Sequence, residues 1–166
     1  MKRYSIGDMV VYGINGIMEV IDLRVEKIAA AEHEYYVLSE PDSRTSSYVY
    51  VPTDNERLVG AMRPLLTREE AQRLVSEAPG IPALEWCADN RVRTEKFRKI
   101  MESGSHPELI SMIKAISLMA EKRAEIGKKN YLSDDHAMQK AKKLLYSELS
   151  LVLGLTADEL EGMIMG

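Results

Sequence analysis

Few residues of this 166-residue chain are of the types that commonly carry chemistry. Cys87 is the only cysteine, and nothing near it in the sequence supplies a base that would activate its thiol. The three histidines, His33, His106 and His136, fall in expected loops or helix starts and are interpreted as exposed polar residues. Asp134 and Asp135 could pair on a metal, but two acids at a helix start more simply complement the helix dipole. The residues therefore predict no enzyme, no metal site and no cofactor.

Trp86 is the residue on which the functional interpretation depends most. It is the only tryptophan, and a stretch rich in Lys and Arg follows it. A single Trp usually packs as a half-buried anchor. At the head of a basic helix, an indole can also act as an apolar wedge against an unstacked step of DNA. The residues alone leave both interpretations open.

Charge is distributed unevenly along the chain, whose net charge is -4. Residues 86–150 contain 13 Lys or Arg against 9 Asp or Glu, whereas residues 1–64 contain 7 against 10. This asymmetry indicates that the two halves meet different partners. Solvation is the ordinary alternative for each exposed cation. The candidates for contacting DNA phosphates are Arg91, Arg93, Lys96, Lys128, Lys129 and Lys140.

The first part of the chain is typical of β-strands. Short runs of β-branched and aromatic residues, separated by turn residues, occur at 9–12, 17–25, 35–38 and 48–51. Turn residues at 41–47 predict a hairpin connection before the last run, and Pro52 ends that run or places it at a sheet edge. Within the last run, Tyr48 and Tyr50 share one face and Val49 and Val51 the other, so one face is core and the other is free for a partner. These runs predict a small antiparallel barrel or meander.

From Thr67 onward the signals are helical. The spacing of a capping box occurs at Thr67 and Glu70, at Ser105 and Glu108, and at Thr156 and Glu159. A further helix is expected between Pro82 and Ser103 with Trp86 near its start, and another from Ser133 to a C-terminal cap at Gly154. Strands followed by helices predict an α+β fold with a β-domain at 1–60 and a helical bundle at 61–166.

The composition also bears on where the chain works. It contains no apolar run long enough to span a membrane, and its first residues do not have the form of an export signal. A single cysteine fits a reducing compartment. We therefore expect a cytoplasmic, nucleoid-associated protein without membrane contact, and a monomer.

Several motifs, taken in order, resemble the CarD family of bacterial transcription regulators. The opening Gly7-Asp8-Met9-Val10-Val11-Tyr12, with Gly16 after a short turn, is similar to the start of that family. Val51-Pro52-Thr53-Asp54-Asn55 matches a later segment of its first domain. In the second half, Trp86 precedes a basic helix that ends at Ser103-Gly104, and Ala141-Lys142-Lys143-Leu144-Leu145 follows further on. The resemblance extends from about residue 3 to 153.

This resemblance implies a fold and a function. The first domain would be a Tudor-like or SH3-like barrel that binds the RNA polymerase β subunit through an exposed strand edge. The helical domain would contact promoter DNA, largely without sequence specificity, at the upstream edge of the transcription bubble. There the tryptophan would wedge into the minor groove and modulate the stability of the open complex. Aligning the strands with the family puts Glu26 and Tyr50 at its polymerase-facing positions. With their neighbours, the candidate polymerase-binding residues are Arg24, Glu26, Lys27, Arg44, Tyr48 and Tyr50.

Two alternatives remain beside a polymerase-binding transcription regulator. A protein–protein adaptor with a β-domain and a helical bundle, but no DNA role, predicts no DNA retardation and a Trp86 shielded from solvent. A hydrolase that uses Cys87 predicts a thiol reactive at neutral pH. The sign of the regulation and the promoters concerned do not follow from the residues.

Overall fold

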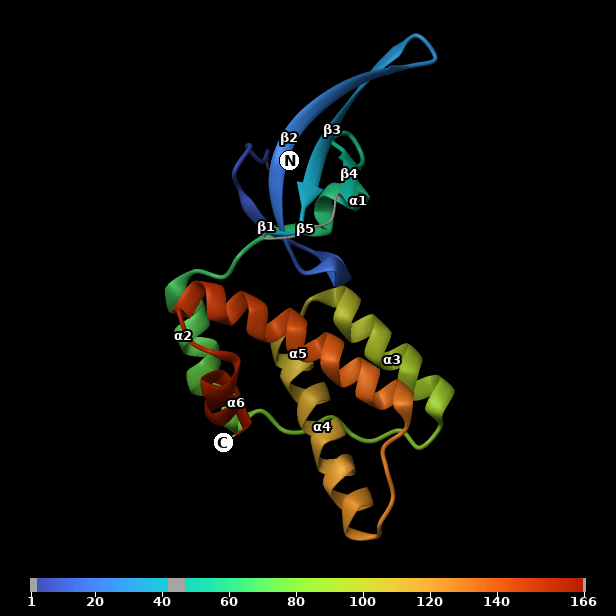
Figure 1. The fold of residues 1–166 in the computed structure, drawn as a ribbon, viewed down its shortest axis with the longest axis vertical. Coiled ribbons are helices and arrows are strands. Elements are labelled where there is room, and N and C mark those ends of the chain that lie inside the picture. The colour runs from blue at the N-terminus through green and yellow to red at the C-terminus, as the bar shows by residue number, and fades with distance from the viewer. Residues whose placement is uncertain (1–2, 42–46, 166) are drawn as a thin grey trace. The chain divides into compact units, whose positions relative to one another are not determined.

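The computed structural model describes residues 3–41 and 47–165. The chain divides into two compact units, Met1–Leu65 and Leu66–Gly166 (Figure 1). This division lies five residues after the boundary expected at residue 60. The reason is a short strand at Met62–Pro64 that pairs with the first strand and so belongs to the first unit.

The first unit is built on one antiparallel sheet of five strands in the order β4-β3-β2-β1-β5. Two short helical segments, η1 (Gly13–Asn15) and α1 (Glu56–Gly60), connect strands. The sheet is open within the described residues, because no pairing joins β4 to β5 there. With helices following the sheet, the predicted α+β class is confirmed. The strands are β1 (Met9–Tyr12), β2 (Ile17–Ile28), β3 (Ala31–Ser39), β4 (Tyr48–Pro52) and β5 (Met62–Pro64).

The alternation of side chains decides which sheet face is core. One face buries apolar residues that pack with Tyr4, Val59 and Met62 into a single cluster. Val51 is fully buried in this cluster, whereas Tyr48 and Tyr50 are exposed on the other face. The expectation that valines and tyrosines of this strand serve opposite faces is therefore confirmed. Besides Met62 of β5, the buried strand residues of the cluster are Val10, Met18, Val20, Tyr36, Leu38 and Val51.

The β2–β3 hairpin turns at two alanines, which the sequence did not mark as a turn. Ala29 has φ 49° and Ala30 has φ 67°, in the left-handed region that costs an L-residue roughly 1–2 kcal/mol. We expect Ala30→Gly to raise the free energy of unfolding of the first unit by about 0.5–1 kcal/mol, after the greater freedom of glycine in the unfolded chain is subtracted. Urea unfolding followed by far-UV circular dichroism measures this change. Ala31→Gly, within β3, should be destabilising instead.

The second unit is a bundle of helices around its own apolar core. The core residues of α4 follow helical spacing, with Leu109, Met112, Ile113 and Ile116 buried, as the sequence predicts. They pack with Leu145 and Leu149 of α5 and with Leu160 of α6. The elements are α2 (Arg68–Glu77), η2 (Ala78–Gly80), α3 (Asn90–Ser103), α4 (His106–Glu125), α5 (Leu132–Leu153) and α6 (Ala157–Met165).

Two of the three expected capping boxes form. Thr67 and Glu70 bond reciprocally at the start of α2, and Thr156 and Glu159 do so before α6. The backbone N–H of Thr67 donates to Glu70 and holds the pKa of that carboxyl below its usual value. The box expected at Ser105 is wrong: its side chain caps nothing, and the Glu108 carboxylate accepts from the Ser103 hydroxyl instead.

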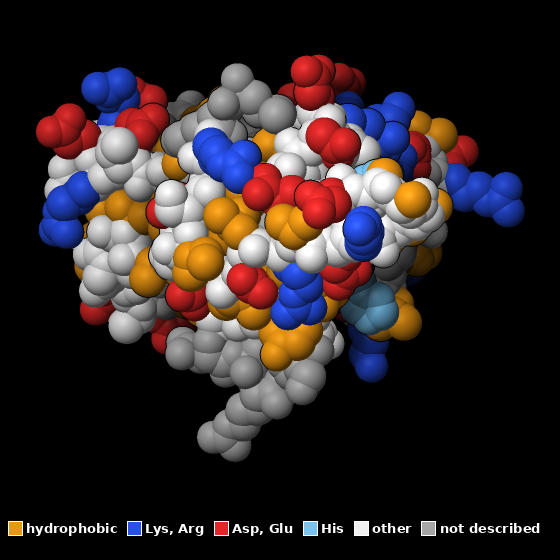
Figure 2. Space-filling model, turned by 90° about the horizontal axis from the view of Figure 1, so that it is seen from above, with side chains coloured by type: hydrophobic (Ala, Val, Ile, Leu, Met, Phe, Trp, Pro, Cys, Tyr) orange, Lys and Arg blue, Asp and Glu red, His pale blue; other side chains and the backbone are white. Residues whose placement is uncertain are grey.

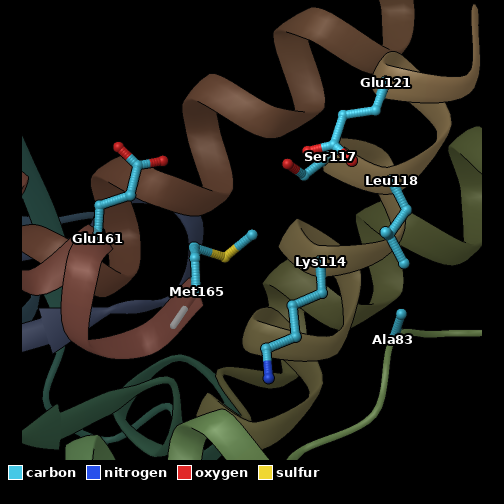
Figure 3. Close-up of a pocket in the computed structure, with 7 residues that line it drawn as sticks. All are labelled: Ala83, Lys114, Ser117, Leu118, Glu121, Glu161 and Met165. Atoms are coloured by element: carbon cyan, nitrogen blue, oxygen red, sulfur yellow. The ribbon is translucent and has the colours of Figure 1, made fainter.

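The segment between η2 and α3 has no regular structure but is tied to α4. Lys114 Nζ donates to the carbonyls of Ala78 and Ile81, each at 2.6 Å. Ser111 bonds the same segment through its hydroxyl, to Pro82 O at 2.9 Å, and its carbonyl accepts from Leu84 N at 3.0 Å. Figure 3 shows Lys114 on the wall of a groove of about 340 Å³ between α4 and the last helix. These bonds fix the chain just before Trp86.

Candidate interaction surfaces

Trp86 lies in the irregular segment before α3 and not within that helix. The helix begins at Asn90, because the Asp89 carboxylate accepts from the backbone N–H groups of Arg91 and Val92 at 3.0 and 3.1 Å. The expectation of Trp86 near the start of the helix is corrected accordingly. Its ring packs edge-on against Phe97, with centroids 6.3 Å apart, and remains partly exposed. Trp86 is therefore an anchored ring with one accessible part.

Arg93 is a buried structural residue and not a phosphate contact. It is 1% exposed, and its guanidinium donates from Nε and one Nη to the two carboxylate oxygens of Asp134, at 2.9 and 3.0 Å. The other Nη donates to the Cys87 carbonyl at 2.9 Å. Asn90 accepts a further bond at 2.8 Å. This corrects the prediction for Arg93. It also shows that Asp134, in the first turn of α5 as expected, takes part in a buried ion pair as well.

A stack of aromatic rings and guanidinium groups joins three elements of the helical unit. Arg93 Cζ lies 4.5 Å from the Trp86 ring centroid and 5.5 Å from that of Tyr131. Arg123 belongs to α4, and its Cζ lies 4.4 Å from the centroid of the Tyr131 ring. Cations over aromatic faces are attracted by the ring quadrupole, most strongly where water is excluded. We name Trp86, Arg93, Tyr131 and Arg123 the stacked cluster.

The other predicted DNA-contacting cations are exposed on the helical unit. Arg91 and Lys96 lie on α3, Lys128 and Lys129 lie in the loop before α5, and Lys140 lies on α5. Lys and Arg side chains are interspersed with Asp and Glu on the face drawn in Figure 2. On α3 itself, Glu95 and Glu102 are the acidic residues against five Lys and Arg.

Arg98 contributes little positive charge to α3. Its guanidinium pairs with Glu95 and with Glu102 on the same helix. The bond from Arg98 holds the pKa of the Glu95 carboxyl below its usual value, so Glu95 stays ionised at neutral pH. The α3 cations that remain for binding phosphates are therefore those outside the group of Arg98, Glu95 and Glu102.

On the first unit, the structure brings together part of the predicted polymerase-binding set. Arg24 Nη1 donates to the Tyr50 hydroxyl at 3.2 Å, and Tyr35 packs edge-on against Tyr50 at 6.4 Å. Glu26 lies two residues beyond Arg24 on the same face of β2, while Lys27 lies on the opposite face. Both are exposed. Arg44 lies outside the described residues.

Strand β4 lies at one edge of the sheet, and among the described residues no strand pairs with its outer side. The N–H of Thr53 donates to the Glu34 carbonyl at 3.0 Å, and the register pairs Val51 with Tyr36. Antiparallel strands exchange bonds at every second residue, so Val49 and Val51 direct their backbone groups to β3. Those of Tyr48 and Tyr50 point outward, which is the arrangement that accepts a partner strand. Pro52 lies on the same outward side as Tyr48 and Tyr50, so its missing N–H removes no hydrogen bond to β3.

Two of the residues weighed for catalysis, Cys87 and His106, have structural contacts. Cys87 Sγ contacts the Asp89 carbonyl at 3.8 Å, an acceptor that cannot serve as a base. His106 is not the exposed polar residue expected, because its Nε2 lies 2.9 Å from the fully buried Glu148. Glu148 also accepts from the Leu66 N–H at 2.8 Å. Within the described residues, His, Cys, Asp and Glu side chains form no group of three that could hold a metal ion.

No helix of the described part is both long and apolar enough to cross a membrane.

Comparison with known proteins supports the interpretation of the first unit. Residues 4–66 match the family model of the CarD-like/TRCF RID domain. This range includes strands β1 to β5 and ends one residue after the first compact unit. A domain of this kind interacts with the β subunit of RNA polymerase. No curated protein matches the chain. Residues 4–66 are therefore a CarD-like/TRCF RID domain by their match to the family model.

Proposed function

We propose that this protein docks on the RNA polymerase β subunit and contacts promoter DNA at the upstream edge of the bubble, where it modulates the stability of the open complex. The observation that carries the DNA part is Trp86, a partly exposed indole fixed over the buried Arg93 guanidinium. The Tudor-like barrel implied for the first domain, and a cytoplasmic, nucleoid-associated location, belong to the same proposal.

The geometry suits a wedge because the ring does not have to be ordered on binding. Phe97 and Arg93 hold the indole in place in the free protein, so little side-chain entropy is lost when it meets DNA. Propping open a base step costs a few kcal/mol, and less where melting has begun. A preformed wedge at the bubble edge therefore favours a step that is already distorted.

The modest charge is compatible with this role. Exposed lysines and arginines hold phosphates without reading sequence, so DNA affinity should be weak and should fall with salt. Docking on polymerase raises the effective concentration of the helical unit at the promoter. Intrinsic specificity for a promoter sequence is then unnecessary.

Trp86→Ala tests the proposal most directly. The change that the wild-type protein produces in open-complex lifetime should be largely lost, about tenfold or ~1.4 kcal/mol, while binding to the polymerase β subunit is retained. Lifetime is measured by challenge of preformed open complexes with a competitor. Leu151→Ala, which removes an exposed apolar side chain about 30 Å along α5 from its start, should leave the effect unchanged. Equal activity of Trp86→Ala and wild type would contradict the proposal.

The adaptor without a DNA role is the second candidate, and the packing of Trp86 on Phe97 favours it. It predicts that DNA is not retarded even at low salt. It also predicts that an aqueous quencher such as acrylamide or iodide reaches the Trp86 fluorescence poorly. The regulator predicts retardation at low salt and a quencher accessibility that falls when DNA is added.

A further inference from the structure

Tyr131 is an exposed aromatic residue that none of the roles above uses. It is the last residue before α5 and is 49% exposed. Its ring contacts the Arg123 guanidinium at 4.4 Å. The ring therefore stacks on Arg123 within the stacked cluster and still leaves about half of its surface in water. The exposed part is accessible to a partner.

The surroundings of Tyr131 fit a nucleic acid. Lys128 and Lys129 are exposed in the same loop, and Lys122 is exposed one turn earlier on α4. Aromatic side chains beside such cations are the usual platform for unpaired bases, because every base has a π-face and the cations hold the phosphates. The loop itself, residues 126–131, contains two lysines and no acidic residue, although Glu125 and Asp135 flank it. Its own charge therefore suits a polyanion.

The loop and the Trp86 segment form one surface of the helical unit. Figure 1 draws the start of α3 and the start of α5 side by side, and the Ser133 hydroxyl donates to the Asn90 side chain at 3.1 Å. Arg93 lies between the two rings, 4.5 Å from Trp86 and 5.5 Å from Tyr131. A partner that reaches the accessible part of Trp86 is consequently close to Tyr131.

We propose that Tyr131 is a second DNA-contacting aromatic residue, which packs against a base left unpaired beside the step that Trp86 props open. The inference rests on the proposed function and adds to it the kind of DNA that is preferred. A junction between duplex and single strand offers both a step to wedge and an unpaired base. The stacked cluster should therefore bind such a junction more tightly than plain duplex.

Fluorescence anisotropy with a labelled forked DNA, and with a fully paired duplex of the same length, tests this on the full chain. Tyr131→Ala should weaken binding to the fork about tenfold and binding to the duplex much less. The slope of log affinity against log salt should stay unchanged, because no cation is removed. Lys128→Ala should instead lower that slope by about one. Tyr131→Phe keeps the ring and should bind like wild type.

Leu132→Ala is the matched control, since Leu132 is the next residue and is 69% exposed. It should bind the fork like wild type. Fork binding by Tyr131→Ala that equals wild type, while Trp86→Ala loses affinity, would overturn the inference and leave the proposed function standing. Failure of the wild-type chain to bind either DNA at low salt would overturn both. Equal losses in Tyr131→Ala and Leu132→Ala would show loss of loop packing and so overturn the stacking role.

Discussion

Replacing Arg93 with methionine is expected to lower the free energy of unfolding of the helical unit by about 3–5 kcal/mol. The change leaves the Asp134 carboxylate, which is 1% exposed, without its bidentate partner. It also releases the Cys87 carbonyl, which accepts from Arg93 at 2.9 Å. A buried charge without a partner is far more costly than the pair is favourable. The expected loss is a large fraction of the stability of a small unit.

Urea unfolding followed by tryptophan fluorescence measures this loss specifically. Trp86 is the only tryptophan and lies in the helical unit, so its signal does not report on the sheet. The double variant Arg93→Met with Asp134→Leu removes both charges and should recover a large part of the loss. Arg98→Met, which breaks exposed pairs on the same helix, should change stability little. A loss in Arg93→Met no larger than in Arg98→Met would contradict a structural role for the buried pair.

The sequence predicted correctly those helices and strands whose residues show a clear spacing of their own. Strands Met9–Tyr12 and Tyr48–Pro52 and the capping boxes at Thr67 and Thr156 appear where their spacing places them. The β2–β3 turn was missed because Ala29 and Ala30 adopt positive φ without being turn-forming residues. The short elements α1 and β5 carry too few residues to show a period, and tertiary pairing creates them.

The candidate site depended on contacts that no local pattern contains. Helical spacing places Arg93, but not Arg91, on the face of Phe97 and Ile100, a sign of burial that the prediction did not use. Its partner Asp134 is 41 residues away, so only the packing of α3 on α5 decides its role. Tyr131 was missed for the same reason, because the contacts that place it beside Trp86 come from Arg93 and Arg123. The lysines named as candidates for DNA contact, Lys96, Lys128, Lys129 and Lys140, are exposed, as their charge favours.

Blocking the free edge of β4 is expected to have the largest effect on polymerase binding. The backbone groups of Tyr48 and Tyr50 point away from β3, so a strand of the β subunit can pair with them. Tyr48→Pro removes one outward N–H at the first residue of the strand, where proline is tolerated. Tyr50→Ala removes a ring that is 44% exposed and bonded to Arg24. Each should weaken binding about 30-fold, or ~2 kcal/mol, as central tyrosines of interfaces do.

Biolayer interferometry with immobilised polymerase β subunit gives these affinities, and circular dichroism checks that the sheet is intact. Ile14→Ala removes an exposed apolar side chain from η1 and should bind like wild type. Glu26→Ala and Lys27→Ala change β2 beyond the reach of the β4 edge. If these two lose binding while Tyr48→Pro retains it, the β subunit meets the β2–β3 hairpin and strand addition at β4 is wrong. Loss in Tyr48→Pro with retention in Glu26→Ala assigns docking to the edge, because a partner strand requires the outward N–H and does not require the hairpin charges.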